Sequence, residues 1–216
     1  MKSYTIHLLR SMPSQGLLEG RYVGRGQSPL AEEALAQILR LKEEFIYPEA
    51  QFFCASPAVA CVDTLRLLYP HAQPEVALEL AECDFGDWEG KTADDLKDDP
   101  RFPLWLAGQG DPPGGESSQV FYRRVCQGFE GLVENLMARS LTETVLVSHA
   151  GVMGAVLARY GLPQAPPQDW LCDPGFGYSL RIMPSLWMRQ PVMEVYGRAP
   201  QPRTAQAQPE EAAKQK

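Results

Sequence analysis

The chain has 216 residues, of which 44% are hydrophobic and 22% are charged, a balance that suits one globular domain with a sizeable core. Its formal net charge is −7 and it contains no Lys/Arg-rich block, so we expect no nucleic-acid partner. No apolar run approaches the roughly 18 residues that cross a bilayer, and the N-terminus does not resemble a secretory signal. We therefore expect no membrane partner.

The five cysteines are scattered along the chain, without C-x-x-C spacing. This pattern indicates neither a disulfide framework nor a zinc site, and it favours a reducing cytoplasm as the location of the protein. Histidine is scarce, with three residues at positions 7, 71 and 149. This scarcity limits the groups that can act as nucleophile or base near neutral pH.

The first element is an apolar run rich in β-formers, Tyr4–Leu9, followed at once by Arg10, Ser11 and a methionine–proline pair. The pattern predicts a buried strand whose carboxyl end delivers Arg10 and Ser11 to a turn, where open α/β sheets bind their ligands. A strand that ends in arginine is ordinary by itself. Its meaning depends on the later segments.

A loop dotted with glycines spans residues 16–29 and carries Arg21, Tyr22 and Arg25. Two interpretations are open: a flexible surface loop, or an anion-facing loop with exposed backbone N–H groups. Residues 29–45 then repeat apolar side chains with a helical period and carry two glutamates in the first turn. This segment is predicted to be a helix.

A short apolar strand is predicted at residues 51–55. Ser56 and Pro57 follow it as the expected N-cap and first helical residue of a helix that continues over residues 58–69. The order strand, helix, strand, helix predicts a mainly parallel sheet covered by helices.

Residues 78–90 mix acids with aromatics and glycines and show no clean period, which is typical of a loop that lines a site. Residues 92–106 are acidic, are interrupted by prolines and are expected to be helical only in parts. After a Gly/Pro-rich break, Glu116 and Ser117 lead into a long amphipathic helix that is predicted to end near Arg139.

A second buried strand is predicted at residues 144–148, and it ends in His149 and Ala150. A helix over residues 152–160 follows, so this segment repeats the arrangement of the first strand, with a polar group at its tip. Closing strands are predicted at residues 177–183 and 193–196.

Together these elements predict an α/β domain over residues 1–198, in which a mainly parallel central sheet is flanked by helices on both faces. The domain contains a helical and loop insertion at about residues 91–117. Arg10 and His149 are expected side by side at the carboxyl edge of the sheet. The tail at 199–216 is rich in Pro, Gln, Ala, Glu and Lys without an apolar period, and is expected to be disordered.

With both strand tips in view, the chain resembles the histidine phosphatase (phosphoglycerate mutase-like) superfamily, and most of all its bacterial α-ribazole phosphatase-like branch. Residues 8–14 align with the family pattern L-x-R-H-G-x-T, and residues 55–64 align with S-S-P-L-x-R-C-x-x-T. The remaining similar segments are 20–25, 82–90, 113–117 and 147–151. The resemblance covers about residues 4–183 and implies the three-layer phosphoglycerate mutase-like fold.

The resemblance also implies a mechanism. In the family, the histidine of the first motif attacks phosphorus and becomes a phosphohistidine, which water hydrolyses, and no metal or cofactor is required. Arginines and the second histidine hold the phosphoryl oxygens while a glutamate protonates the leaving oxygen. Such an arrangement matches the needs of phosphoryl transfer, namely an in-line nucleophile, cations around the phosphoryl group and an acid at the leaving group.

Carried over position by position, the resemblance assigns Ser11 to the nucleophile position, with Glu82 and His149 as the other catalytic residues. Phosphate binding would involve Arg10, His149 and Ala150. The implied substrate pocket contains Arg21, Tyr22, Arg25, Glu116 and Ser117.

The chain departs from the pattern at its centre. Ser11 replaces the nucleophilic histidine, Met12 replaces the following glycine, and Ala60 stands at the second arginine position. Leu17 stands where an asparagine is frequent. His7 lies inside the first strand and faces opposite to residue 10, so it is a poor substitute nucleophile.

Three hypotheses follow from these departures. The first is a histidine phosphatase-like protein whose phosphatase chemistry is lost or very weak, and whose pocket binds a phosphorylated or anionic small molecule or a partner protein. The second is an active phosphomonoesterase with rearranged catalysis, in which Ser11 or His149 is the nucleophile. The third is a structural or regulatory module that binds no phosphate.

Overall fold

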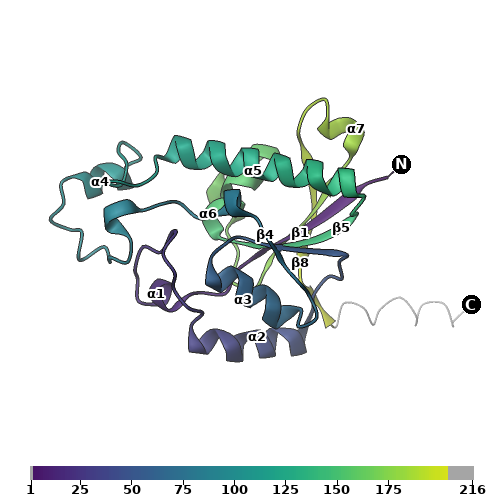
Figure 1. Cartoon of the computed structure of the whole chain (residues 1–216), viewed down its shortest axis with the longest axis horizontal. Helices are drawn as coiled ribbons and strands as arrows, with labels where there is room; N and C mark the ends of the chain where they lie inside the picture. Colours follow the sequence, from purple (N-terminus) through teal and green to yellow (C-terminus); the bar gives the residue numbers. More distant parts are fainter. Residues whose placement is uncertain (1, 204–216) are drawn as a thin grey trace, which may run out of the picture.

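The computed structural model describes residues 2–203, which form a seven-stranded sheet in the order β4-β3-β5-β1-β7-β8-β6 (Figure 1). Its strands are β1 Tyr4–Arg10, β3 Phe52–Ala55, β4 Glu75–Val76, β5 Glu143–Ser148, β6 Gly161–Leu162, β7 Gly177–Ile182 and β8 Met193–Ala199. Strand β7 runs antiparallel to its neighbours β1 and β8, and the other pairs are parallel. The mainly parallel sheet predicted from the sequence is therefore confirmed.

Helices cover both faces of the sheet, as predicted (Figure 1). The described helices are α1 Gln15–Leu18, α2 Glu32–Glu44, α3 Val59–Leu68, α4 Arg101–Leu106, α5 Ser118–Arg139, α6 Ala150–Tyr160 and α7 Pro184–Trp187. Ile6 and Leu8 of β1 pack in one core with α5 and α6, whereas Leu9 packs in a second core with α2 and α3. Alternation of side chains along β1 thus separates the two cores.

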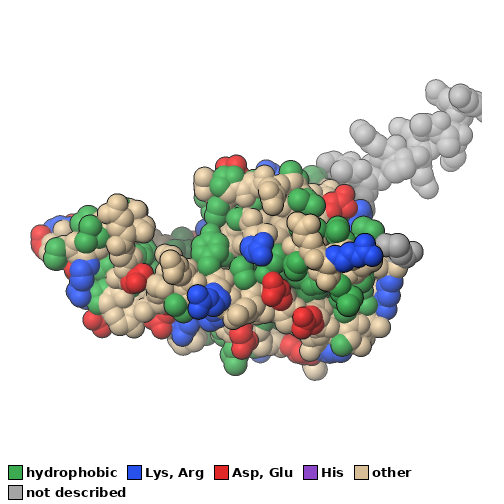
Figure 2. All heavy atoms as spheres, turned by 90° about the horizontal axis from the view of Figure 1, so that it is seen from above, with side chains coloured by type: hydrophobic (Ala, Val, Ile, Leu, Met, Phe, Trp, Pro, Cys, Tyr) green, Lys and Arg blue, Asp and Glu red, His purple; other side chains and the backbone are tan. Residues whose placement is uncertain are grey.

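The expected insertion forms an arm that carries α4, with a small aromatic core of its own. Trp88, Leu96 and Phe102 are buried in it. Tyr22 and Trp105 pack edge to face at 5.3 Å between ring centroids. The arm projects from the main body as a separate lobe, and charges of both signs are scattered over this face of the molecule (Figure 2). Residues from the glycine loop and from the insertion therefore meet in one cluster.

Two local expectations are wrong, because Ser56 is not the N-cap of the helix that follows β3 and Pro57 is not its first residue. Helix α3 begins at Val59 with Ala58 as its N-cap, so Ser56 does not cap it. The Ser56 hydroxyl instead donates to the Leu80 carbonyl at 2.6 Å and lies 2.6 Å from the Ser148 hydroxyl. This buried contact ties the end of β3 to residues 78–90, the segment rich in acidic residues, which we call the acid loop. The local sequence does not reveal this role.

The expected disorder of the C-terminal tail is also wrong for the first residues of that tail. Strand β8 continues through Ala199, and β9 (Gln201–Pro202) pairs antiparallel with β2 (Phe45–Ile46). Disorder from residue 199 is therefore wrong for the first five residues of the expected tail, and its remainder, 204–216, lies outside the described residues. Among residues 2–203, no helix combines the length and apolarity that crossing a membrane requires.

Candidate functional site

The tips of β1 and β5 meet at the carboxyl edge of the sheet, as the two strand motifs predict. Arg10 pairs in register with Ser148, and the Ser11 amide donates to the Ser148 carbonyl at 2.8 Å. Ser11 and His149 consequently line one narrow cavity of about 40 Å³, which Ala60 also lines. The nucleophile position, the second-arginine position and the second histidine therefore converge.

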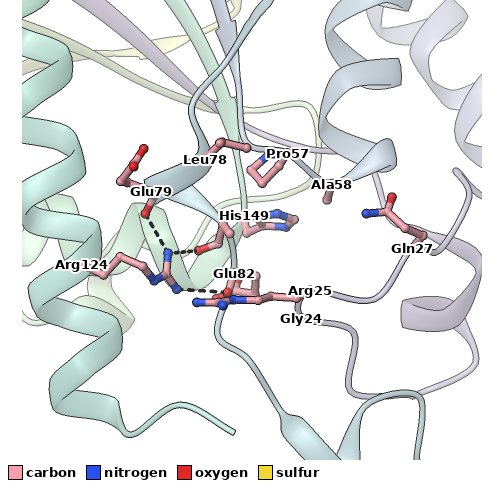
Figure 3. Close-up of a pocket in the computed structure, with 11 residues that line it drawn as sticks. Gly24, Arg25, Gln27, Pro57, Ala58, Leu78, Glu79, Glu82, Arg124 and His149 are labelled. Atoms are coloured by element: carbon pink, nitrogen blue, oxygen red, sulfur yellow. Dashed lines mark hydrogen bonds between the residues drawn. The ribbon is translucent and has the colours of Figure 1, made fainter.

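His149 also lines a larger pocket of about 330 Å³ (Figure 3). Its other lining residues are Gly24, Arg25, Gln27, Pro57, Ala58, Leu78, Glu79, Ala81, Glu82 and Arg124. They come from the glycine loop, the start of α3, the acid loop and α5. His149 thus faces the larger pocket while also bordering the narrow cavity that contains Ser11.

A buried thiol lies beside His149. Cys61 Sγ is 3.4 Å from His149 Nε2 and 3.8 Å from Nδ1. Burial raises the pKa of Cys61 to about 12, although the polar side chain of Ser11 opposes this shift. The thiol is protonated at neutral pH, so it is a weak hydrogen-bonding neighbour of His149 rather than a nucleophile or base.

The His149 ring is neutral at physiological pH. Burial lowers its pKa, and the negative charge of Glu82 only partly opposes that effect. The Glu82 carboxylate accepts from the amides of Cys83 at 2.9 Å and Gly151 at 3.3 Å. A side chain at Gly151 would place Cβ 2.5 Å from Glu82 Oε1, so the Glu82 carboxylate would have to shift from its present position. The predicted pair Glu82 and His149 is therefore brought together at the start of α6, whose first residue is Ala150.

Arg124 clamps the acid loop from helix α5. Its Nε and Nη2 donate to the two carboxylate oxygens of Glu116 at 2.9 and 2.7 Å. The same guanidinium donates to the carbonyls of Glu79 at 2.7 Å, Ala81 at 2.9 Å and Glu82 at 3.2 Å. The three bonds to carbonyl oxygens hold the backbone that carries Glu82 in place, so Arg124 shapes the pocket wall (Figure 3).

The predicted pocket residue Glu116 is buried in this clamp, with 5% of its side chain exposed. Burial alone would raise the pKa of Glu116, but the hydrogen bonds and charge of Arg124 outweigh it and lower the pKa. Glu116 also lies 3.6 Å from Arg25 Nη2, while Arg25 Nη1 is 3.5 Å from Asp84 Oδ2. Arg25 keeps about half of its side chain exposed and lines the pocket, as expected.

The other expected pocket residues do not line the His149 pocket. Arg21 pairs with Glu19 at 2.7 Å and donates to the Gly90 carbonyl at 2.8 Å. Tyr22 belongs to the aromatic core of the arm. Ser117 is the N-cap of α5, and its hydroxyl accepts from the Val120 amide at 3.2 Å. These side chains support the elements around the pocket.

Arg10 and His149 do not share a cavity. Arg10 Nη1 donates to the Cys172 carbonyl at 2.6 Å, and the side chain lines a separate cavity near the start of β7. The cause is the alternation along β1, which directs Arg10 and Ser11 to opposite faces of the sheet. The two cations that would surround a phosphoryl group in the family pattern are thus missing beside His149, because the second position is Ala60.

Sequence reasoning missed Cys61, Gln27 and Arg124. Cys61 lies in the same motif as Ala60, one residue on, so its contact with His149 follows from the motif pairing. Arg124 carries a weaker signal, since it lies about two helical turns after the buried Glu116. In the part of the chain described, no cluster of His, Cys, Asp and Glu could hold a metal ion.

Comparisons with known proteins agree with this fold. The sequence profile of the Histidine phosphatase superfamily (branch 1) matches residues 6–184. The chain belongs to the histidine phosphatase superfamily. No curated protein sequence matches it.

Solved structures extend the comparison. The α-ribazole phosphatase from Shigella flexneri aligns with a TM-score of 0.72 and 24% identity over 88% of this chain and 94% of that one. A phosphoglycerate mutase from Bacillus anthracis str. Sterne aligns with a TM-score of 0.70 and 16% identity, covering 90% and 92%. The protein TTHB049 from Thermus thermophilus is 28% identical, with a TM-score of 0.58 and coverage of 83% and 92%. The fold is therefore phosphoglycerate mutase-like, as predicted.

Proposed function

We propose that this chain is a histidine phosphatase-like protein whose phosphohistidine chemistry is lost or strongly reduced. Its pocket around His149 binds a phosphorylated or otherwise anionic small molecule. The observation that carries the proposal is the environment of Ser11, which lines a narrow cavity together with Ala60 and therefore has no arginine at the second-arginine position beside it. Among residues 2–203, the His149 ring contacts the Cys61 thiol, and no hydrogen bond joins the Ser11 hydroxyl to a base that could activate it.

The expected loss of rate is large. Each preorganised charge contact in a transition state contributes about 3 kcal/mol, or on the order of 10²-fold in rate. Ser11 and Ala60 remove a nucleophile and a cation together, and Arg10 donates to the Cys172 carbonyl in another cavity. Such losses do not add, but they affect two of the roles that phosphoryl transfer requires, the nucleophile and the cations around the phosphoryl group.

Three features support anion binding at the remaining pocket. Arg25 is half-exposed at the pocket and its nearest carboxylates are 3.5 Å and 3.6 Å away, so it can reorient toward a ligand. Gln27 offers further hydrogen bonds from the same loop. The N-terminus of the eleven-residue helix α6 lies next to His149, and a helix N-terminus favours negative charge. An anion there would also favour protonation of His149.

The test combines turnover and binding. Hydrolysis of a generic aryl phosphate is measured for the wild type, for Ser11→Ala and for the Ser11→His/Ala60→Arg double variant. We expect no turnover in the first two proteins and measurable turnover in the third. Wild-type turnover that Ser11→Ala abolishes would overturn the proposal.

Binding is measured by thermal shift with inorganic phosphate and with vanadate. A ligand held by the native state raises its stability, and Arg25→Gln should weaken that effect. Arg40→Gln, on helix α2, changes the same charge away from the pocket and is the matched control. No shift in the wild type would favour a structural or regulatory module, and binding of a partner protein at the pocket is the alternative occupant.

The presence of Ser11 and His149 in one cavity favours a second candidate, an active phosphomonoesterase with rearranged catalysis. In that case Ser11 or His149 would become phosphorylated. Intact-mass measurement after incubation with aryl phosphate distinguishes the two functions, since an adduct mapped to either residue supports the enzyme. The free cysteines of the described chain fit a reducing compartment, and we assign the protein to the cytoplasm.

A further inference from the structure

A further cavity, of about 380 Å³, lies at the same edge of the sheet, and His149 is not among the residues that line it. Arg10 and Arg198 both line it, together with Cys172, Asp173 and Phe176. None of these five residues lines the His149 pocket or the narrow cavity that contains Ser11. The family comparison gives no function to this combination of side chains.

The strand register explains why the two arginines face each other. Leu8 of β1 pairs with Tyr178 of β7, and Tyr178 pairs with Arg198 of β8. Paired residues point to the same face of a sheet, and Arg10 lies two residues beyond Leu8, so it shares that face. Strands β1 and β8 are separated only by β7, which puts their backbones about 10 Å apart. Two long guanidinium side chains can therefore reach one ligand from opposite sides.

The cavity carries a net positive charge in an acidic protein. Neither Arg10 nor Arg198 forms an ion pair with a residue in the range 2–203, although Asp173 lies at the same cavity. Arg10 uses one nitrogen for the Cys172 carbonyl and keeps its other donors. Burial raises the pKa of the Cys172 thiol to about 11, and the positive charges of Arg10 and Arg198 oppose that shift. The electrostatic influence of both arginines therefore reaches Cys172.

We propose that Arg10 and Arg198 form a second anion-binding site, which takes the phosphate group of a small molecule. Paired guanidinium groups bind phosphate through charge-assisted, bidentate hydrogen bonds. The volume is within the range of ordinary small-molecule sites and exceeds that of phosphate alone, so the ligand carries an organic part. Cys172 and Phe176 supply the less polar wall for that part.

The test uses inorganic phosphate as the probe and Cys172 as a local reporter. Alkylation of Cys172 by N-ethylmaleimide is followed by peptide mass spectrometry at constant ionic strength, with Cys126 of helix α5 as the internal control. At a phosphate concentration ten times Kd, occupancy should slow the reaction of Cys172 by about tenfold and leave Cys126 unchanged.

Arg198→Gln should weaken half-maximal protection by at least about tenfold, because it removes charged hydrogen bonds. Arg189→Gln, an exposed arginine on the loop after α7, removes the same charge elsewhere and should behave as the wild type. Unchanged Cys172 reactivity in saturating phosphate, or equal protection in Arg198→Gln, would overturn the second site.

The His149 pocket is distinguished from the second site by measuring both signals, the thermal shift and the alkylation of Cys172, in the same variants. Arg25→Gln should weaken the phosphate-induced thermal shift and preserve the protection of Cys172. If Arg25→Gln and Arg198→Gln each removed both signals, a single shared site would be established and the second site would be refuted.

Discussion

Replacing Arg124 with methionine should destabilise the domain by about 3–5 kcal/mol, the usual cost of removing one partner from a buried ion pair. Glu116 exposes 5% of its side chain and Arg124 18%, so the Glu116 carboxylate would remain buried without its two hydrogen bonds. Three backbone carbonyls of the acid loop would also lose a donor. Methionine retains the aliphatic stem, so the loss reports on charge and hydrogen bonding.

For a chain of this size, each kcal/mol corresponds to about 2–4 °C in Tm, so the expected fall is about 6–20 °C. Urea unfolding monitored by tryptophan fluorescence gives the free energy directly. Arg123→Met is the matched control, because Arg123 is exposed and adjacent in sequence. The double variant Arg124→Met/Glu116→Gln should recover part of the loss, since it removes the buried charge. A loss below about 1 kcal/mol in Arg124→Met would refute the reasoning.

Two further predictions concern helix α5 and pH. Gly131→Ala should stabilise the protein by about 0.5–1 kcal/mol, because the new Cβ meets nothing within 4 Å in a helix interior. Gly128→Ala should destabilise it by about 1–3 kcal/mol, because Cβ would lie 2.5 Å from Glu79 Cβ, and equal effects in urea unfolding would contradict this contrast. Burial lowers the pKa of His7 and His149 below 6.5, so the unfolded chain binds more protons in mild acid. The free energy of unfolding is therefore highest above pH 6.5 and falls as the pH drops toward the lowered pKa values of the two histidines. Equal urea midpoints at about pH 7.5 and pH 5.5 would be evidence against this pH dependence.

The main elements could be predicted because each contains its own periodic signal. Strand β1 is a run of apolar β-formers and α5 repeats its apolar side chains over 22 residues. The two-residue strands β2, β4, β6 and β9 carry no such signal, since two residues show no period. Their pairing depends on neighbours that are distant in sequence.

For the site, the sequence predicts which strands end close together, but not how the side chains at those ends are oriented. Ser11 and His149 converge because parallel strands end at one edge, a rule that depends on topology alone. The direction of the Arg10 side chain was predictable from the alternation of side chains along β1, which had already excluded His7 as a nucleophile. The family motif nevertheless suggested that Arg10 and His149 share one pocket. The Arg124 clamp was not predictable, because its partners include carbonyl oxygens, which every residue possesses.

The position of β1 in the sheet order has a consequence for synthesis of the chain. The first strand to leave the ribosome is the central one, and both of its partners, β5 and β7, belong to the last third of the chain. Roughly 130 residues separate β1 from β5, so at about 5–20 residues per second the strand waits on the order of 10 s for its first partner. During that interval its apolar side chains are exposed to other nascent chains and to chaperones. Slower translation would lengthen that exposure, whereas a chain rearranged to begin at β5 would greatly shorten it.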